Sequence, residues 1–128
     1  MLFMSSSKKV LIIDDDRSLL RQLRVRLEKR EKVEVITCDC GKQGLEQALE
    51  HDFDLIILDW MLPDIQGIDV LEALKANSVT RDIPVLMLTG RNKIGEVEDA
   101  FEQGAEGYLT KPCELQKLGD KVSDMLAA

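Results

Sequence analysis

The sequence has little of several residue types that support particular chemistries. Its 128 residues include one histidine, three cysteines and one tryptophan, and aromatic residues make up only 4%. The single histidine, His51, falls near the end of a predicted helix, which suits neither a Ser-His-Asp nor a Cys-His catalytic arrangement. The cysteines are odd in number, and Cys38-x-Cys40 is too tight for usual zinc spacing. We therefore expect reduced thiols in a cytoplasmic protein.

Long apolar runs and an excess of positive charge are also lacking. No run approaches the ~18 residues of a membrane span, and the first nine residues do not have the layout of a signal peptide. With 17 basic and 24 acidic side chains, the net charge is −7, which argues against a nucleic-acid binder. Residues 17–32, however, carry seven basic and two acidic side chains. We interpret this basic stretch as a solvated helix face, with a docking edge for an acidic partner as the alternative.

The chain length is that of one domain, and we expect a flexible segment over 1–7 followed by one domain over 8–128. Four apolar runs without alternation fit strands that are covered on both faces. A fifth strand is predicted with less apolar character. The runs are Val10–Ile13, Val33–Ile36, Leu55–Leu58 and Val85–Leu88, and the fifth is Gly107–Thr110.

Segments with helical spacing of apolar residues lie between and after these runs. Their apolar positions are Leu19, Leu20, Leu23 and Leu27; Leu45, Ala48 and Leu49; Ile68, Leu71 and Leu74; Ile94, Val97, Ala100 and Phe101; and Leu115, Leu118, Val122, Met125 and Leu126. Strand and helix thus alternate five times. This alternation predicts an α/β fold, a single-domain doubly wound parallel sheet with helices on both faces and the flavodoxin-like strand order 2-1-3-4-5.

Polar residues follow the strands of this predicted sheet where a ligand would bind. Ligands of such sheets bind beyond the carboxyl ends of the strands, where the strand order reverses. The first strand runs into Asp14-Asp15-Asp16, the third ends at Asp59, the fourth ends at Thr89, and Lys111 follows the fifth. We expect Asp16 to cap the first helix. The other carboxylates, the hydroxyl and the ammonium group should therefore meet at one edge.

Clustered carboxylates at Asp14, Asp15 and Asp59 would repel one another unless a cation offset their charge. Oxygen-only ligands favour Mg²⁺, with Mn²⁺ as a substitute. Such sites commonly complete their shell with phosphate oxygens, and a carboxylate can itself attack phosphorus. Asp59 is the best nucleophile because it ends the central strand. Lys111 would help to neutralise the transferring phosphoryl group.

These residues together resemble the receiver domain of two-component response regulators. The resemblance covers Lys8 to Leu126 and is closest to receivers of winged-helix transcription regulators. The motifs that carry it are Asp14-Asp15, Asp59-x-x-x-Pro63-x-x-x-Gly67, Thr89-Gly90 and Tyr108-x-x-Lys111-Pro112.

The resemblance implies a role for each residue of the site. Asp59 would be the phosphoacceptor, Asp14 and Asp15 would bind Mg²⁺ with Asp59, and Met61 would lend its backbone carbonyl. Lys111 would contact the phosphoryl group, and its bond to Pro112 would be cis. Thr89 would hydrogen-bond to the phosphoryl group, and Tyr108 would swing inward as Thr89 moves.

The resemblance also implies partners. The phosphodonor would be a sensor histidine kinase or a histidine phosphotransfer protein. A downstream protein would recognise the face formed by the helix over 94–101, the strand over 107–110 and the helix over 115–126. The chain would be a signalling switch rather than an enzyme, without membrane or direct nucleic-acid binding, and a monomer or a weak phosphorylation-dependent dimer.

Two alternatives stay open at the level of sequence. A haloacid-dehalogenase-type phosphatase would also form an aspartyl phosphate, but on Asp14, in the pattern Asp14-x-Asp16. A receiver-like adaptor would bind partners without being phosphorylated. Trp60 and Cys113 are interpreted as packing residues, Trp60 at the rim of the site and Cys113 as a small buried side chain.

Overall fold

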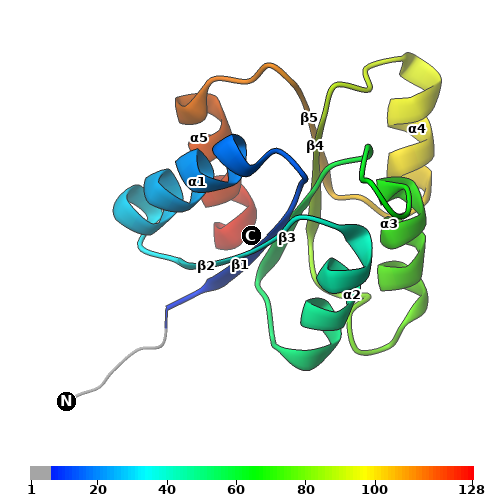
Figure 1. Ribbon diagram of the computed structural model, residues 1–128, viewed down its shortest axis with the longest axis horizontal. Coiled ribbons are helices and arrows are strands. Elements are labelled where there is room, and N and C mark those ends of the chain that lie inside the picture. Colours follow the sequence, from blue (N-terminus) through cyan, green and yellow to red (C-terminus); the bar gives the residue numbers. More distant parts are fainter. Residues whose placement is uncertain (1–6) are drawn as a thin grey trace.

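The computed structural model describes residues 7–128 as one five-stranded parallel sheet with helices on both faces (Figure 1). The segment predicted to be flexible, 1–7, lies outside the described residues except for Ser7. The elements in chain order are β1 (Lys9–Ile13), α1 (Arg17–Arg26), β2 (Glu34–Cys38), α2 (Gly41–Glu50), β3 (Leu55–Leu58), α3 (Gly67–Ala76), β4 (Val85–Thr89), α4 (Ile94–Glu102), β5 (Gly107–Thr110) and α5 (Leu115–Ala127). The strand order is β2-β1-β3-β4-β5, as predicted.

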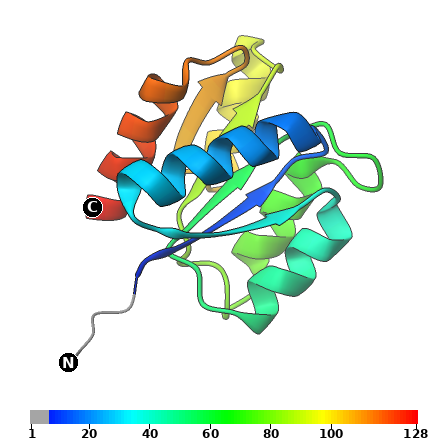
Figure 2. The same cartoon turned by 60° about the vertical axis from the view of Figure 1, so that its left-hand side comes forward.

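Alternating strand residues supply the cores on the two faces of the sheet. Leu11 and Ile13 of β1 pack toward α2, α3 and α4, whereas Val10 and Ile12 pack toward α1 and α5. Figure 2 shows α1 lying across its face of the sheet with α5 beside it. Because both faces are covered, the strands need no polar alternation, which explains their continuous apolar runs.

The first and fourth strands are each one residue longer than predicted, and two predicted segments differ more at their ends. The second strand was expected over Val33–Ile36, but β2 runs from Glu34 to Cys38 because it pairs with β1 along its whole length, with Ile13 opposite Cys38. The first helix continues after α1 as a π-helical segment over Leu27–Glu31, and Lys32 then adopts a left-handed conformation with φ 57°.

The apolar positions predicted for the fourth helix are only partly buried. Ala100 is fully buried, but Ile94 is 78% exposed and Phe101 is 47% exposed. Helix α4 lies at the β5 side of the sheet, and β5 is the last strand there (Figure 1). No further element of the described chain covers the outer part of the stripe, so these side chains remain available at the surface.

Asp64, in the loop between β3 and α3, caps the start of α2. Its two carboxylate oxygens accept the backbone N–H groups of Gly41 and Lys42, each at 2.8 Å. These bonds, that of Lys42 above all, lower the pKa of Asp64 to about 2. The contact ties the loop that follows β3 to a neighbouring helix.

Replacing Asp64 by alanine should lower the free energy of unfolding at pH 7 by roughly 1 kcal/mol, since two helix N–H groups lose their acceptor. Because the pKa of the folded state is depressed, this contribution is present above about pH 4 and fades as the pH falls through about 2. Urea unfolding of wild type and Asp64→Ala at pH 7 measures the difference, and an NMR titration of the Asp64 carboxyl carbon measures the pKa. A midpoint near the ordinary value for aspartate would contradict the proposed cap.

Candidate functional site

The acidic cluster predicted from the sequence is present at the carboxyl edge of the sheet. Carboxylate oxygens of Asp14, Asp15 and Asp59 lie within 4.8 Å of one another. Asp14 is 2% exposed and Asp59 is 5% exposed, whereas Asp15 is exposed. The parallel strands produce this proximity because β1 and β3 are neighbours and end at the same level, with Ile13 opposite Leu58.

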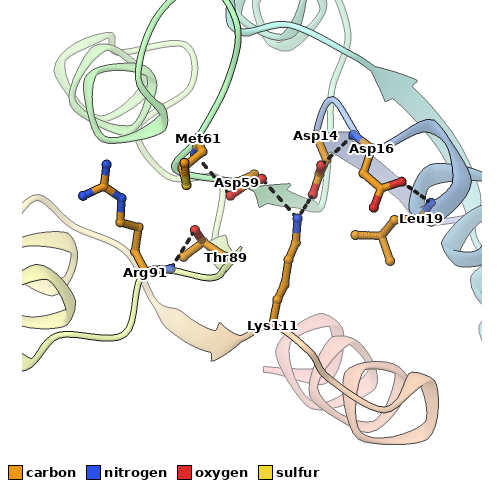
Figure 3. Close-up of polar contacts among 8 residues, drawn as sticks. All are labelled: Asp14, Asp16, Leu19, Asp59, Met61, Thr89, Arg91 and Lys111. Atoms are coloured by element: carbon orange, nitrogen blue, oxygen red, sulfur yellow. Dashed lines mark hydrogen bonds and ion pairs between the residues drawn. The ribbon is translucent and has the colours of Figure 1, made fainter.

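Lys111 bridges the two buried carboxylates. Its Nζ lies 2.7 Å from Asp14 Oδ2 and 3.1 Å from Asp59 Oδ2. Figure 3 shows the ammonium group between the two carboxylates. Burial opposes the charge of Lys111, but the hydrogen bond and charge of Asp14, together with Asp59, raise the pKa of Lys111 above its ordinary value. Burial also raises the pKa of Asp14. The Lys111–Pro112 peptide bond is cis, as predicted.

Backbone groups fix the outer oxygens of the two buried carboxylates. The N–H of Asp16 donates to Asp14 Oδ1 at 2.9 Å, and the N–H of Met61 donates to Asp59 Oδ1 at 3.2 Å. The Asp16 carboxylate accepts from the Leu19 N–H at 3.1 Å and caps α1, as predicted. Asp16 is therefore occupied by the helix, while Asp14 and Asp59 point toward Lys111 (Figure 3).

The donor set fits a small divalent cation. Opposite ligands of an octahedral Mg²⁺ lie ~4.2 Å apart, close to the spread of the three carboxylate oxygens. One lysine offsets one of the three negative charges, so two remain to be balanced. Asp14, Asp15 and Asp59 are therefore suited to a divalent metal, and the carbonyl of Met61 remains a predicted further ligand.

Thr89 and Tyr108 lie on the side of the site nearest to α4. Thr89 is fully buried at the end of β4, and its Oγ1 accepts the Arg91 N–H at 3.3 Å, which leaves the hydroxyl hydrogen free to donate. The Tyr108 hydroxyl donates to the Arg91 carbonyl, and burial raises the pKa of Tyr108. The predicted inward swing of Tyr108 stays a prediction.

Trp60 and Cys113 flank the site. Trp60 is 6% exposed, and its Nε1 donates to Gln66 Oε1 at 3.2 Å, which agrees with a packing role beside Asp59. Cys113 was expected to be buried, but it is only half-buried. It lies in the loop between β5 and α5, at the edge of the α1–α5 core, where neighbouring side chains cover it on one side.

Sequence reasoning missed several contacts of Arg91. The Arg91 guanidinium pairs with Glu96 of α4 at 2.7 Å, and its central carbon lies 5.9 Å from the centroid of the Trp60 ring. In the sequence, only its place two residues after Thr89 connects Arg91 with the site. The contact with Trp60 does not follow from the sequence, because Trp60 lies in a different loop. The ion pair with Glu96 does not follow either, because it joins the loop before α4 to the helix itself.

Comparisons with known proteins agree with this geometry. A family model described as the response regulator receiver domain matches residues 10–123. The chain is 42% identical over 103 residues to the transcriptional regulatory protein KdpE of Mycobacterium tuberculosis, covering 80% of this chain and 44% of that protein. It is 32% identical over 114 residues to the chemotaxis protein CheY of Pseudomonas aeruginosa, covering 89% of this chain and 92% of that protein.

A solved structure of a CheY-like response regulator receiver domain protein from Methanospirillum hungatei superimposes with a TM-score of 0.87 at 30% identity, covering 95% of each chain. The chain spans about half the length of most curated relatives that it matches, CheY being an exception. Relatives named as transcription regulators agree with the subfamily resemblance predicted from the sequence. No helix within residues 7–128 is long and apolar enough to cross a membrane.

Proposed function

Because the chain belongs to the response regulator receiver domain family of two-component signalling, we propose that Asp59 accepts a phosphoryl group and thereby switches the surface around α4. The donor is a phosphohistidine on a sensor histidine kinase or a histidine phosphotransfer protein. The observation that carries the proposal is the placement of Asp59: a buried carboxylate at the end of the central strand, bridged by Lys111 to a second buried carboxylate.

The chemistry is an in-line transfer at phosphorus. A carboxylate oxygen of Asp59 forms the new P–O bond while the P–N bond of the phosphohistidine breaks, and the electron pair of that bond goes to the departing imidazole. Lys111 neutralises charge on the phosphoryl oxygens, and the Thr89 hydroxyl donates a hydrogen bond to one of them. The ordering of the carboxylates by the N–H groups of Asp16 and Met61 keeps Asp59 in position for attack.

We propose Mg²⁺, with Mn²⁺ as a substitute, as the cofactor. Asp14, Asp15 and Asp59 would hold it together with the carbonyl of Met61. When bound, the cation supplies positive charge that draws the phosphoryl oxygens to the acceptor. Lys111 donates to Oδ2 of both Asp14 and Asp59, so it would share these carboxylates with the cation.

The phosphorylated state is recognised on the face formed by α4, β5 and α5. The exposure of Ile94 and Phe101 on this face supports recognition by a downstream protein. Thr89 and Tyr108 connect it to the acceptor through the Arg91 backbone. In this proposal the chain works in the cytoplasm as a switch without substrate turnover of its own, as a monomer or a weak phosphorylation-dependent dimer, and it does not bind nucleic acid directly.

The two alternatives raised by the sequence find less support. A phosphatase that uses Asp14-x-Asp16 would need a free carboxylate at Asp16, but that group caps α1. An adaptor without phosphorylation would have no need for the buried carboxylates and Lys111. The arrangement therefore favours the phosphorylated switch.

Intact-mass spectrometry after incubation with acetyl phosphate and Mg²⁺ tests the proposal. Wild type should gain one phosphoryl group, and Asp59→Asn should gain none because an amide oxygen is a poor nucleophile. Asp69→Asn, an exposed position in the first turn of α3, is the matched control and should behave as wild type. Equal phosphorylation of Asp59→Asn and wild type would refute Asp59 as the acceptor.

A further inference from the structure

Arg91 connects the acceptor loop with α4 through contacts of its backbone and its side chain. The backbone N–H donates to Thr89 Oγ1, and the carbonyl accepts the Tyr108 hydroxyl. The side chain pairs with Glu96 at 2.7 Å and lies over Trp60, with 5.9 Å between the guanidinium carbon and the ring centroid. Arg91 therefore contacts Thr89, Tyr108, Glu96 and Trp60.

The Trp60 ring, which the Arg91 guanidinium lies over, belongs to the residue after the acceptor. Trp60 follows Asp59 directly, is 6% exposed, and is fixed by its hydrogen bond to Gln66. The Arg91 side chain, in contrast, is 40% exposed, so it can rotate without disturbing the core. In Figure 3 its guanidinium points away from the Asp59 carboxylate.

Glu96 keeps the guanidinium in this outward position. One oxygen of Glu96 binds Arg91, and the other accepts the Lys93 N–H at the start of α4, at 3.4 Å. The hydrogen bond from Arg91 lowers the pKa of Glu96. Glu96 therefore links the position of Arg91 to the first turn of α4.

The charge of the site changes when the phosphoryl group arrives. A phosphoryl group carries about two negative charges and three acceptor oxygens, whereas the carboxylate that it modifies carried one. The site becomes more negative by about one charge, and a guanidinium matches phosphate oxygens with paired donors. The added charge therefore attracts a cation that lies over Trp60, the residue after the acceptor.

We propose that the Arg91 guanidinium is a second cationic contact for the phosphoryl group on Asp59, and that Glu96 competes for it in the unphosphorylated protein. The inference rests on the proposed function, since it requires a phosphoryl group at Asp59. Inward rotation breaks the Arg91–Glu96 ion pair and leaves the first turn of α4 without that link. The competition thus couples phosphorylation to the helix whose exposed face a partner would bind.

Calorimetric titration with beryllofluoride and Mg²⁺, as a stand-in for the phosphoryl group, tests the competition. Arg91→Gln should weaken beryllofluoride binding roughly five- to tenfold because a charged donor is lost. Glu96→Gln should strengthen it about threefold because the competitor is removed. In the Arg91→Gln background, Glu96→Gln should have no effect, since there is no guanidinium left to release.

Controls on the same chain separate this competition from a general change in charge. Arg81→Gln and Glu102→Gln alter exposed residues by the same charge and should bind beryllofluoride as wild type does. As a second measurement, the Glu96 carboxyl carbon should titrate below its ordinary pKa in the free protein and return toward it when beryllofluoride is bound.

The outcomes distinguish the two proposals. If Arg91→Gln and Glu96→Gln both bind beryllofluoride with the affinity of wild type, the competition between Glu96 and the phosphoryl group is refuted. The role of Asp59 as phosphoacceptor is not affected by that result. If the titration of Glu96 does not change on binding, Arg91 has stayed on Glu96 and the inference is also wrong. If wild type neither binds beryllofluoride nor gains a phosphoryl group, the proposed function fails and the inference fails with it.

Discussion

Replacing Lys111 by methionine should slow phosphorylation of Asp59 by acetyl phosphate and Mg²⁺ on the order of 100-fold. Methionine keeps an unbranched stem of similar length but removes the charge that contacts both Asp14 and Asp59. Removing one positioned donor from a site of developing negative charge typically costs a factor of 10² to 10³ in rate. Intact-mass spectrometry over time, with Lys117→Met in the exposed part of α5 as the control, measures the effect.

The same substitution should have the opposite effect on Mg²⁺ binding. Lys111 donates hydrogen bonds to one oxygen of Asp14 and one oxygen of Asp59, so the ammonium group and a bound cation would compete for these two oxygens. Loss of the ammonium group leaves the two buried carboxylates without a positively charged partner, which strengthens their attraction for a divalent ion. Tighter Mg²⁺ binding together with slower phosphorylation would show that only the ammonium group has been lost. A site disrupted as a whole would instead show weaker Mg²⁺ binding and slower phosphorylation. An unchanged rate in Lys111→Met would contradict the role of Lys111.

The placement of the acidic cluster could be predicted from the sequence for a simple physical reason. Strands that are buried on both faces appear as continuous apolar runs, and the carboxyl ends of parallel neighbours meet at one edge. Asp14 and Asp59 each follow such a run directly. The order of the strands then brings the two carboxylates together, and Lys111 approaches from the loop after the last strand.

Contacts made by long side chains could not be predicted in this way. Lys75 of α3 is an example: its Nζ donates to the carbonyls of Arg81 and Ile83 and pairs with Glu106 at 2.9 Å. These partners lie in two loops separated by β4 and α4, and nothing in the sequence near Lys75 indicates them. The Arg91–Trp60 contact has the same character, since it joins two loops that only the folded sheet places side by side.

The exposure of apolar side chains on α4 could not be predicted for another reason. The spacing of Ile94 and Phe101 is that of a buried helix stripe, but spacing alone does not tell how much of the stripe the sheet covers. At the last strand of a sheet, a helix has neighbours on one side only. The apolar residues left uncovered here belong to the face that we propose for partner recognition. The same apolar stripe thus serves the core with its buried part and can bind a partner with its exposed part.

Replacing Gly67 by alanine should lower the free energy of unfolding by roughly 3 kcal/mol. Gly67 begins α3, and its N–H donates to the Trp60 carbonyl at 2.6 Å. A Cβ added here would lie 1.9 Å from the Asp59 carbonyl oxygen and 2.7 Å from the Trp60 Cα. Both are backbone atoms, so no side chain can rotate to make room, and the loop that carries the acceptor must move.

Gly95→Ala is the matched control, because a Cβ added to Gly95 in α4 meets nothing within 4 Å. Alanine in place of glycine favours a helix by up to about 1 kcal/mol, so this variant should be as stable as wild type or slightly more stable. Urea unfolding of the three proteins measures the difference. Coincident unfolding of Gly67→Ala and wild type would mean that the loop can open at little cost. If Gly67→Ala is destabilised as expected, the phosphorylation of its folded fraction should also fall, because the tight turn after β3 positions Asp59 and the N–H of Met61 together.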